Sequence, residues 1–301
     1  MANTIELAKK YLPMLDEVYA ASAKTAILDA PAEWVREGAK ANEVLIPSIA
    51  VDGLGDYDRN SGFVAGDVDF SWETHQFTQD RGRSFVIDAQ DNAETLDVAF
   101  AATTGEFIRT KVVPEVDAYR FAVLADKAGN SEDADLDKDT ALEAIDAGLE
   151  ALAEAEVDLM DVVIFVSPKV HTYLKQSGSI TRQFQVQAGA GVVNREIEVL
   201  DGKPVIVVPQ NRFYSAIDLN DGVTTGQEAG GYAKASAGLD INFLLVDPNA
   251  VLGIKKTAMP RIFSPEVYQG ADAWKFDYRL YHDLFVKENK VDGIYLHTVA
   301  A

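Results

Sequence analysis

The clearest alternation of apolar and polar positions predicts an extended strand from residue 67 to residue 73. Apolar side chains occupy every second position there, with Asp, Ser or Glu between them: Val68, Phe70 and Trp72 against Asp67, Asp69, Ser71 and Glu73. Glu43 to Val51 predicts a partner strand, in which Pro47 favours an edge position or a bend. The Gly-rich stretch Asp52 to Gly66 would join the two strands as a tip. These segments together predict a long hairpin.

One face of this hairpin needs a cover that the hairpin alone does not supply. An isolated two-stranded hairpin is marginally stable in water, and the face that carries Phe70 and Trp72 is apolar. The cover could come from the same subunit or from a neighbouring one. Because no partner for the arm follows locally in the sequence, the pattern favours a neighbouring subunit.

A helical pattern follows the hairpin. Gln79 to Arg83 predicts a polar turn, and Phe85 and Ile87 then mark one face of a short strand. From Asp91 to Ala125, apolar residues recur at helical steps or multiples of them and form one stripe: Leu96, Phe100, Phe107, Val112, Val116 and Tyr119. Pro114 lies inside this pattern, and it predicts either a kink or a helix restart with the proline in the first turn.

The middle of the chain predicts a compact α/β unit. Asn130 to Asp139 predicts an acidic linker. Thr140 and Glu143 match a capping box at the start of a helix with the apolar stripe Leu142, Ile145, Leu149 and Leu152. The apolar run Val162 to Val166 predicts a strand buried on both faces, and Ser167-Pro168 predicts the start of another helix that ends at Gln176. This order of helix, strand and helix indicates a central sheet.

The last third of the chain predicts strands separated by turns. Asp201-Gly202 is a hairpin signal between two apolar runs, Ile197 to Leu200 and Val205 to Val208. Leu219 to Gly238 is rich in small residues and predicts a surface loop. Further strands are predicted at 241–246, at 251–255, at 274–286 and, after a turn at Asp292-Gly293, at 294–299. The strand from Trp274 is unusually long and has two distinct faces.

Composition narrows the class of protein. The chain has 301 residues, of which 48% are hydrophobic, and no Cys, so it supports a large core but no disulfide or thiolate metal site. Its formal charge of -21 at pH 7 repels phosphate backbones, so sequence-wide nucleic-acid binding is not expected. Met1 to Lys10 lacks the pattern of a signal peptide, and no apolar run approaches membrane-spanning length. We therefore expect a soluble protein that is made inside the cell.

No candidate catalytic, cofactor-binding or metal-binding residue emerges from the sequence. The four histidines lack any metal-ligand spacing: His75, His171, His282 and His297. His171 shares a predicted helix face with two lysines and is expected to be exposed. Asp133 to Asp139 resembles the start of a calcium loop, but Lys138 and Ala144 replace the Gly and the Glu that such a loop requires. No stretch matches a dinucleotide site, a P-loop or a nucleophile elbow, and we expect no enzyme activity.

Three stretches of the chain carry a resemblance to a known family: Ile46-Pro47-Ser48 with Val51 and the Gly-rich tip, Gln79-Asp80-Arg81 with Phe85, Ile87 and Asp88, and the run from Val113 to Arg120. They resemble signature stretches of the major capsid proteins of tailed bacteriophages, whose shell fold is called the Hong Kong 97 type. The Pro-Glu-Val-Asp-Ala-Tyr-Arg block is the most specific of the three. In element order the resemblance covers nearly the whole chain.

The resemblance implies an α+β capsid fold with named parts. It places an N-terminal arm at 1–42, an extended β-hairpin loop at 43–82, a peripheral domain with a long spine helix at 83–135 and 258–292, and an axial domain at 136–257 and 293–301. Many relatives carry a helical scaffolding extension before the arm. Since the arm here starts almost at Met1, we expect either a separate scaffolding protein or an extension that has been removed.

The resemblance also implies a function without catalysis. The chain would be a structural major capsid protein that self-assembles into pentamers and hexamers of an icosahedral shell around phage double-stranded DNA. Its partners would be further copies of itself, a separate scaffolding protein, a portal, decoration proteins and DNA held without sequence-specific contacts, with no cofactor, metal or membrane. It would be located in the virion and assembled in the bacterial host cytoplasm.

Two alternatives remain open from the sequence. The first is an encapsulin-type nanocompartment shell, which shares the fold but encloses a protein cargo. The second is an acidic hydrolase or binding protein with a Gly-rich lid at Leu219 to Gly238.

Overall fold

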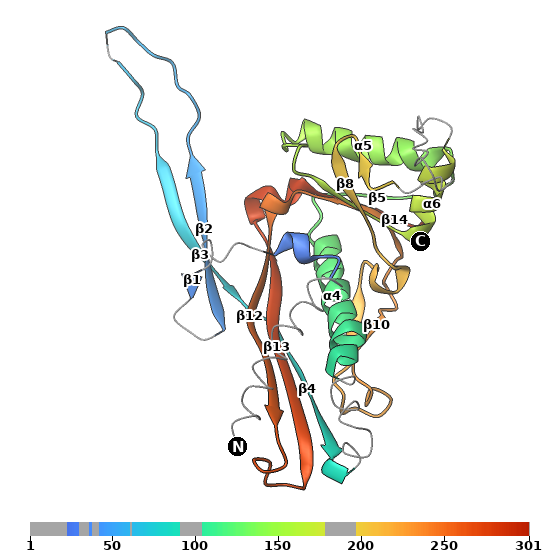
Figure 1. The fold of residues 1–301 in the computed structure, drawn as a ribbon. Helices are drawn as coiled ribbons and strands as arrows, with labels where there is room; N and C mark the ends of the chain where they lie inside the picture. The colour runs from blue at the N-terminus through green and yellow to red at the C-terminus, as the bar shows by residue number, and fades with distance from the viewer. Residues whose placement is uncertain are drawn as a thin grey trace, which may run out of the picture.

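A long three-stranded sheet runs through the molecule between a projecting hairpin and a second, six-stranded sheet (Figure 1). The structure is a computed structural model that describes residues 23–29, 36–37, 42–60, 62–90, 104–177 and 197–300. The arm expected at 1–42 therefore lies largely outside the described residues, as do Leu96 and Phe100 of the expected helix. No helix in the described part is long and apolar enough to cross a membrane.

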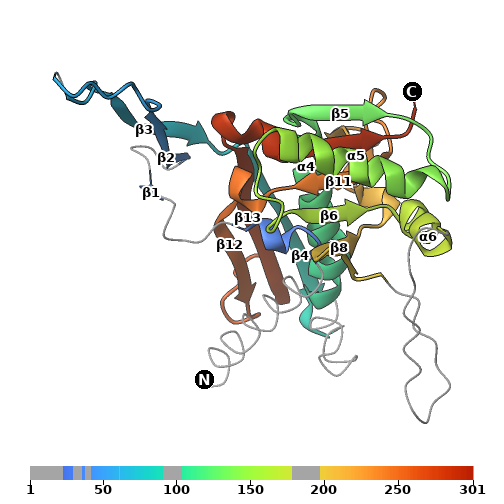
Figure 2. The same ribbon diagram turned by 90° about the horizontal axis from the view of Figure 1, so that it is seen from above.

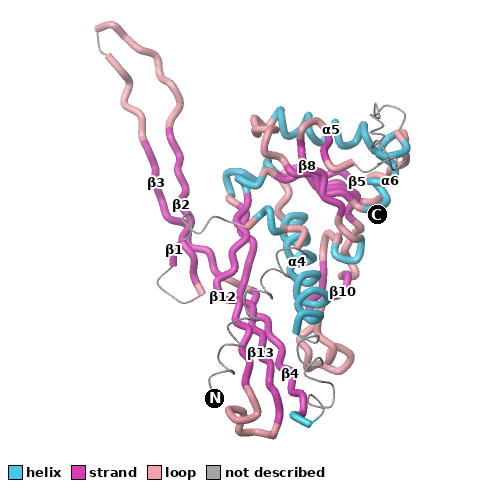
Figure 3. The backbone as a smooth tube through the Cα atoms, viewed as in Figure 1, coloured by secondary structure: helices cyan, strands magenta, loops and turns pink. Residues whose placement is uncertain are grey.

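The projecting hairpin is formed by β2 (Glu43–Val51) and β3 (Val68–Gln76), and β1 (Arg36–Glu37) pairs with its base. The two long strands are antiparallel and stay in register from Glu43 opposite Gln76 to Val51 opposite Val68. Figure 3 shows both strands giving way to loop at the tip, and Figure 2 shows that the hairpin points away from the rest of the molecule. The predicted hairpin is thus confirmed.

The long sheet has the strand order β12 (Val251–Phe263), β13 (Ala273–Val286) and β4 (Gln79–Asp88). The predicted long two-faced strand from Trp274 is confirmed as β13. The predicted turn at Gln79 to Arg83 is wrong, because β4 already begins at Gln79 and pairs with β13. Two of these polar side chains find charged partners in the strand, Arg279 for Asp80 and Glu115 for Arg81.

The helix that packs on this sheet widens just before Pro114. Residues 104–107 are helical, Ile108–Val112 form a π-helix, and α4 (Val113–Asp126) continues without a break in helical dihedral angles. The N–H of Val113 bonds to the carbonyl of Ile108, one residue further back than in an α-helix. A proline removes a donor and crowds the carbonyl four residues back. The predicted restart at Pro114 is wrong, because the helix runs through this point without a break and accommodates the proline with the wider π-helical turn just before it.

The second sheet has six strands, and their order across the sheet is β5 (Asn130–Asp133), β14 (Ile294–Thr298), β11 (Ile241–Val246), β6 (Val163–Val166), β8 (Lys203–Val207) and β7 (Val199–Leu200). β14 runs parallel to β5, so the first four residues of the expected acidic linker are an edge strand instead. The predicted turn at Asp201-Gly202 is confirmed, and both residues adopt positive φ angles, which suit a tight hairpin turn.

Helices cover both faces of the six-stranded sheet. α5 (Thr140–Glu154) and α6 (Pro168–Gln176) pack on one face, and the C-terminal half of α4 packs on the other through Phe121 and Leu124. Every residue of β6 and β11 is buried, which explains their continuous apolar sequences. A Cβ at Gly148 would lie 2.9 Å from Leu245 and 2.9 Å from Tyr295 side-chain carbons, so α5 approaches the sheet this closely only with glycine there.

The two helix starts use different caps. Ser167 Oγ accepts the N–H of Val170 at 3.3 Å, as the Ser-Pro signal predicted. The capping box predicted at Thr140 is wrong, because Thr140 is already helical and its N–H donates to Asp137 Oδ1 at 2.9 Å. The Asp137 carboxylate takes the capping role three residues upstream of Thr140. Its acceptance of these bonds lowers the pKa of Asp137.

The remaining elements lie outside the long sheet and the six-stranded sheet. The expected surface loop at Leu219 to Gly238 is in part a two-stranded ribbon of β9 (Ile217–Leu219) and β10 (Tyr232–Lys234). Short helices complete the described chain: η1 (Ala26–Leu28), η4 (Gln210–Arg212), η5 (Pro248–Ala250) and η6 (Glu288–Gly293).

Candidate functional site: the projecting hairpin and its polar hub

The outer half of the hairpin exposes a set of large apolar side chains. Phe70 is 53% exposed and Val68 is 66% exposed, and their neighbours on β2, Ile49 and Val51, are exposed to a similar degree. Contiguous exposed apolar surface on a soluble protein commonly marks an interaction site. The alternation seen in the sequence therefore places an uncovered apolar surface on the arm.

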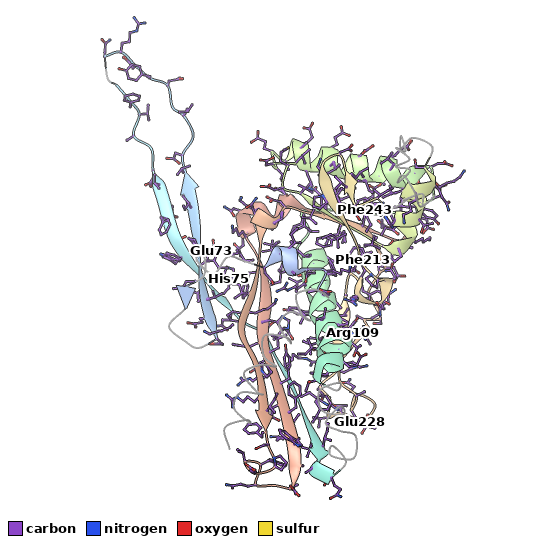
Figure 4. All side chains as sticks on the ribbon, viewed as in Figure 1. Glu73, His75, Arg109, Phe213, Glu228 and Phe243 are labelled. Carbon is purple, nitrogen blue, oxygen red and sulfur yellow. The ribbon has the colours of Figure 1, made fainter. Side chains whose placement is uncertain are left out.

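The base of the hairpin is buried against the long sheet. Val44 and Ile46 of β2, with Phe77, pack against a set of residues on β12 and β13: Leu252, Ile254 and Phe285. The ring of Phe77 lies 5.0 Å from that of Tyr281 and 5.5 Å from that of Phe285. Figure 4 shows Glu73 and His75 on this lower part of the hairpin. The hairpin is therefore anchored at one end and free at the other.

A hydrogen-bonded joint fixes the chain where the hairpin enters the long sheet. The N–H and the hydroxyl of Thr78 donate to Asp283 Oδ2 at 2.7 Å and 2.9 Å. The Tyr119 hydroxyl of α4 donates to the other oxygen of Asp283 at 2.7 Å. Burial, together with the Asp283 carboxylate, raises the pKa of Tyr119, so the phenol remains a donor. Through Asp283, the joint holds Thr78, which follows the hairpin, to α4 and to β13.

A polar hub lies beside this joint. It consists of three buried residues, Thr25, Asp117 and Arg120, and three partly buried ones, Asp29, Arg212 and Lys255. Asp117 of α4 is fully buried, and it accepts the Thr25 hydroxyl at 2.7 Å and the Thr25 N–H at 3.1 Å. Its second oxygen accepts Arg212 Nη1 at 3.0 Å. Asp117 thus ties the N-terminal segment and η4 to the same turn of α4.

The rest of the hub is held by Arg120, one turn further along α4. Arg120 is fully buried, and its Nη1 donates to the Thr25 carbonyl at 3.0 Å while its Nη2 donates to Asp29 at 2.7 Å. Lys255 of β12 donates to the other oxygen of Asp29 at 2.8 Å. A Cβ on Gly253 would lie 2.9 Å from Arg120 Nη2, so glycine is needed where the guanidinium crosses the strand. Desolvation lowers the pKa of Lys255, against the opposing effect of Asp29.

The structure does not gather the four histidines into one site. His75 lies on the hairpin and His282 on β13, as predicted, and His297 is buried on β14. The exposure predicted for His171 is wrong: it is buried, and Nε2 lies 3.3 Å from the Ile197 carbonyl. Within the described ranges, no group of three or more His, Asp or Glu residues is placed to hold a metal ion.

We expect His282 to make the protein sensitive to acid. Burial is the largest cause that lowers the pKa of His282 from its ordinary 6.5 to about 3; Arg120, Lys255 and Arg81 lower it further, and Asp29 opposes them. The unfolded chain takes up this proton near pH 6.5 and the folded chain only near pH 3. The free energy of unfolding should therefore fall by about 1.4 kcal/mol per pH unit as the pH drops through this window.

The measurement is urea unfolding at several pH values between 6.5 and 4.5. His282→Gln should remove about one proton from the slope of stability against pH. His75→Gln, at the hairpin base, is the control for replacing a histidine by glutamine elsewhere in the chain, and its slope is compared with that of His282→Gln. An unchanged slope in His282→Gln would contradict the assignment.

Comparisons with known proteins give the fold. No protein-family model and no curated protein matches the sequence. Among solved structures, a chain of the bacteriophage PhiM1 mature capsid matches with a TM-score of 0.58 and 14% identity, over 86% of this chain and 82% of that chain. A chain of the cyanophage P-SCSP1u capsid matches with a TM-score of 0.58 and 12% identity, over 88% and 85%. A Gordonia phage Cozz chain gives 0.58 and 12%, over 93% and 87%.

This chain has a phage capsid fold. The resemblance to tailed-phage major capsid proteins inferred from short sequence stretches is therefore confirmed for the fold. The mixed helix and strand composition expected for it is confirmed as well.

Within this capsid fold, the polar residues of the block from Pro114 to Arg120 bind segments that are distant in the sequence. Glu115 accepts Arg81 Nε of β4 at 2.7 Å, and the three other polar residues of the block enter the joint and the hub already described: Asp117, Tyr119 and Arg120. Sequence reasoning identified the block but not its partners. One signal for the partners was present in the sequence: charged residues alternate with the apolar stripe of this helix. Charged residues that are buried with such a stripe need partners of opposite charge.

Proposed function

We propose that the chain is a structural major capsid protein, whose copies assemble into pentamers and hexamers of an icosahedral shell that encloses phage double-stranded DNA. The observation that carries the proposal is the shared fold, which spans 82% of the PhiM1 capsid chain and 85% of the P-SCSP1u capsid chain. The exposed apolar hairpin supports it, because a second copy would cover that surface. In this proposal the chain acts by assembly and not by catalysis.

The proposed parts of the subunit follow the sequence resemblance. Residues 1–42 form the N-terminal arm and 43–82 the extended loop, which lies over a neighbouring subunit. The peripheral domain contains 83–135 and 258–292, with α4 in its spine helix. The axial domain contains 136–257 and 293–301 and lies near the centre of each capsomer. The projection of β2 and β3 and the separate six-stranded sheet support this division.

The proposed partners are further copies of the chain, a separate scaffolding protein, a portal and decoration proteins. The packaged DNA is held without sequence-specific contacts, in agreement with a formal charge of -21. Assembly takes place in the bacterial host cytoplasm, and the mature location is the virion.

The test is to purify particles formed by the native chain in its host and to analyse what they enclose. Large particles that contain nuclease-protected double-stranded DNA are the expected result. Particles filled with one protein cargo would favour a nanocompartment shell. A protein that sediments as a monomer or a dimer would contradict both kinds of shell.

Assembly should respond to ionic strength. Subunits that each carry a formal charge of -21 repel one another, and the Debye length falls from about 10 Å at 0.1 M salt to about 3 Å at 1 M. We therefore expect the light scattering of an assembling sample to rise as sodium chloride is added. A steady decrease with salt would mean that complementary ion pairs between subunits dominate the assembly energy.

A further inference from the structure

A strap of small and polar residues extends from the six-stranded sheet along α4. We call residues Asn220 to Gly231 the strap; it joins β9 to β10, and Val223 is its one large apolar residue. Figure 4 shows Glu228 of the strap near the lower end of α4, far from Phe243 in the six-stranded sheet. In the described part of the chain, no strap residue belongs to a hydrophobic core cluster. Apolar packing therefore does not hold the strap in place.

The strap has hydrogen bonds of its own. Asp221 Oδ1 accepts the N–H groups of Val223 and Thr224, both at 2.8 Å, and Oδ2 accepts the Thr224 hydroxyl at 2.6 Å. These bonds, the one from the Thr224 hydroxyl above all, lower the pKa of Asp221 to about 2. Further along, the N–H of Gly226 donates to Glu228 Oε2 at 2.9 Å. These contacts do not depend on the rest of the molecule, so the strap can move as a unit.

The root of the strap is fixed to the unit that carries the six-stranded sheet. The strands β9 and β10 pair with each other there as a short antiparallel ribbon. The Tyr232 hydroxyl donates to the carbonyl of Asn211 at 2.8 Å, and Lys234 pairs with Asp240. A two-stranded ribbon is weak by itself, so the ribbon between this anchored root and the strap is the place where the strap can turn.

Two arginines of β4 hold the far end of the strap, and we call Arg81 and Arg83 the clasp. Arg83 donates Nη1 and Nη2 to the carbonyl of Glu228, both at 3.1 Å, and Arg81 donates Nη2 to the carbonyl of Gly231 at 3.3 Å. Gly222 has a φ of +76°, and a Cβ there would lie 3.1 Å from Arg83 Nη1, so glycine makes room for the guanidinium. Arg83 is exposed to water, unlike the buried bonds within the hub, so its bonds break and re-form readily.

The clasped strap forms one side of a hollow of about 980 Å³, whose other sides are β4 and the helical turns around Pro114. Aromatic side chains that include Phe85, Phe107 and Tyr278 line it. The rings of Phe85 and Phe107 lie 4.9 Å apart, and both side chains are only partly buried. The hollow separates the strap from these rings, so the strap restricts access to them from one side without packing on them.

We propose that the strap is a lid on this hollow. In the closed state, which the structure shows, the clasp binds the carbonyls of Glu228 and Gly231. In the open state these bonds are lost, the strap turns about the β9–β10 ribbon, and the aromatic side of the hollow becomes accessible. The anchored root, the internal bonds and the exposed polar clasp are the features that carry the proposal. It goes beyond the proposed function, since it concerns a motion within one subunit.

The first experiment is limited proteolysis of the unassembled full-length chain with a protease that cleaves after glutamate. The carbonyl at the Glu228 cleavage site is the one that Arg83 holds. When a site opens and closes quickly, its cleavage rate follows the population of the open state, so Arg83→Ala should speed cleavage after Glu228 about tenfold. Cleavage after Glu266, which is exposed between β12 and β13, is the reference within the same chain and should keep its rate.

Arg279→Ala is the matched control. It removes an exposed arginine of the same sheet, whose partner is Asp80 and which does not line the hollow, so the strap should be cleaved at the native rate. Cleavage of Arg83→Ala after Glu228 at the native rate would overturn the lid. Equal acceleration after Glu228 and after Glu266 would show general loosening of the subunit and would overturn it as well.

The second experiment measures the motion itself, and the chain has no Cys of its own to interfere. Val223→Cys on the strap and Arg109→Cys on the π-helix, both exposed positions, carry nitroxide labels whose separation is measured by double electron–electron resonance. Excess unlabelled chain removes distances between subunits. The native chain should give one narrow distance distribution. Arg83→Ala should make it about twice as broad, because the open state gains population.

A second label pair tests whether the rest of the subunit stays in place. Asp218→Cys on β9 and Glu154→Cys on α5 lie at exposed positions of the six-stranded unit, and their distance distribution should stay narrow with Arg83→Ala. Equal widths of the strap distribution in the native chain and in Arg83→Ala would contradict the lid. Neither experiment requires shells to form, so failure of the lid and failure of the proposed function are distinguishable.

Discussion

Replacing Phe70 by aspartate is expected to abolish shell assembly while the subunit still folds. Phe70 is 53% exposed, so its removal costs the isolated subunit little. In the proposed shell, a neighbouring copy covers it, and burial of such a side chain contributes about 1.5–3 kcal/mol at each repeat of the contact. A carboxylate at that position would instead have to lose its water without a partner. Sedimentation measures the assembly, and circular dichroism of the unassembled fraction measures the fold.

Ser71→Asp is the control for this prediction. Ser71 is exposed on the opposite face of β3, which already carries Asp69 and Glu73, and the substitution adds the same charge one residue away. Shells should still form in this variant. If Phe70→Asp assembled like the native chain, the apolar face of the hairpin would not be an interface. If its subunit lost native circular dichroism, Phe70 would belong to the core of its own subunit.

Asp117→Ala should produce the largest loss of subunit stability. The substitution leaves Arg212 and the backbone N–H groups of Lys24 and Thr25 without their buried acceptor. Removing one partner of a buried ion pair typically lowers the free energy of unfolding by about 3–5 kcal/mol. Urea unfolding monitored by tryptophan fluorescence gives the value.

Glu115→Ala provides the matched comparison on the same helix. Glu115 pairs with Arg81, and both side chains are partly exposed, at 17% and 26%. A partly exposed pair of this kind contributes up to about 1 kcal/mol. Similar losses in the two variants would mean that the hub does not hold the N-terminal segment to α4 through Asp117.

The sequence predicted those elements whose signal is local. The alternation around Phe70, the Asp201-Gly202 turn and the Ser167-Pro168 helix start each depend on a few adjacent residues, and all three are present in the structure. The apolar run of β6 likewise identified a strand buried on both faces. In these cases the interactions that determine the structure are made by residues close together in the sequence.

The wrong predictions have two causes. In some cases a side chain pairs with a residue that is distant in the sequence, and in one case a nearby side chain competes for the same hydrogen bond. Gln79 to Arg83 looks like a polar turn until Asp80 meets Arg279, 199 positions away, across β4 and β13. The capping box at Thr140 failed because the Asp137 carboxylate, three residues upstream, is a competing acceptor for the same N–H. His171 is buried although its helix face carries lysines, because the chain near Ile197 covers it.

In the candidate site too, the sequence predicted the features with a local signal and missed those that depend on distant partners. The sequence identified the hairpin, its apolar face and the block at Pro114 to Arg120. It did not reveal the hub, because Thr25 and Asp117 lie 92 positions apart and Asp29 and Lys255 lie 226 positions apart. Pairing over such separations is determined by tertiary packing and leaves no local pattern.

Electron cryomicroscopy of the assembled native protein tests the central claim most directly. The account predicts closed icosahedral particles built from rings of five and six subunits, with the hairpin of each subunit lying over the next one and the apolar face around Phe70 covered. Particles in which the hairpin folds back onto its own subunit, or a sample of dispersed monomers and dimers, would contradict it.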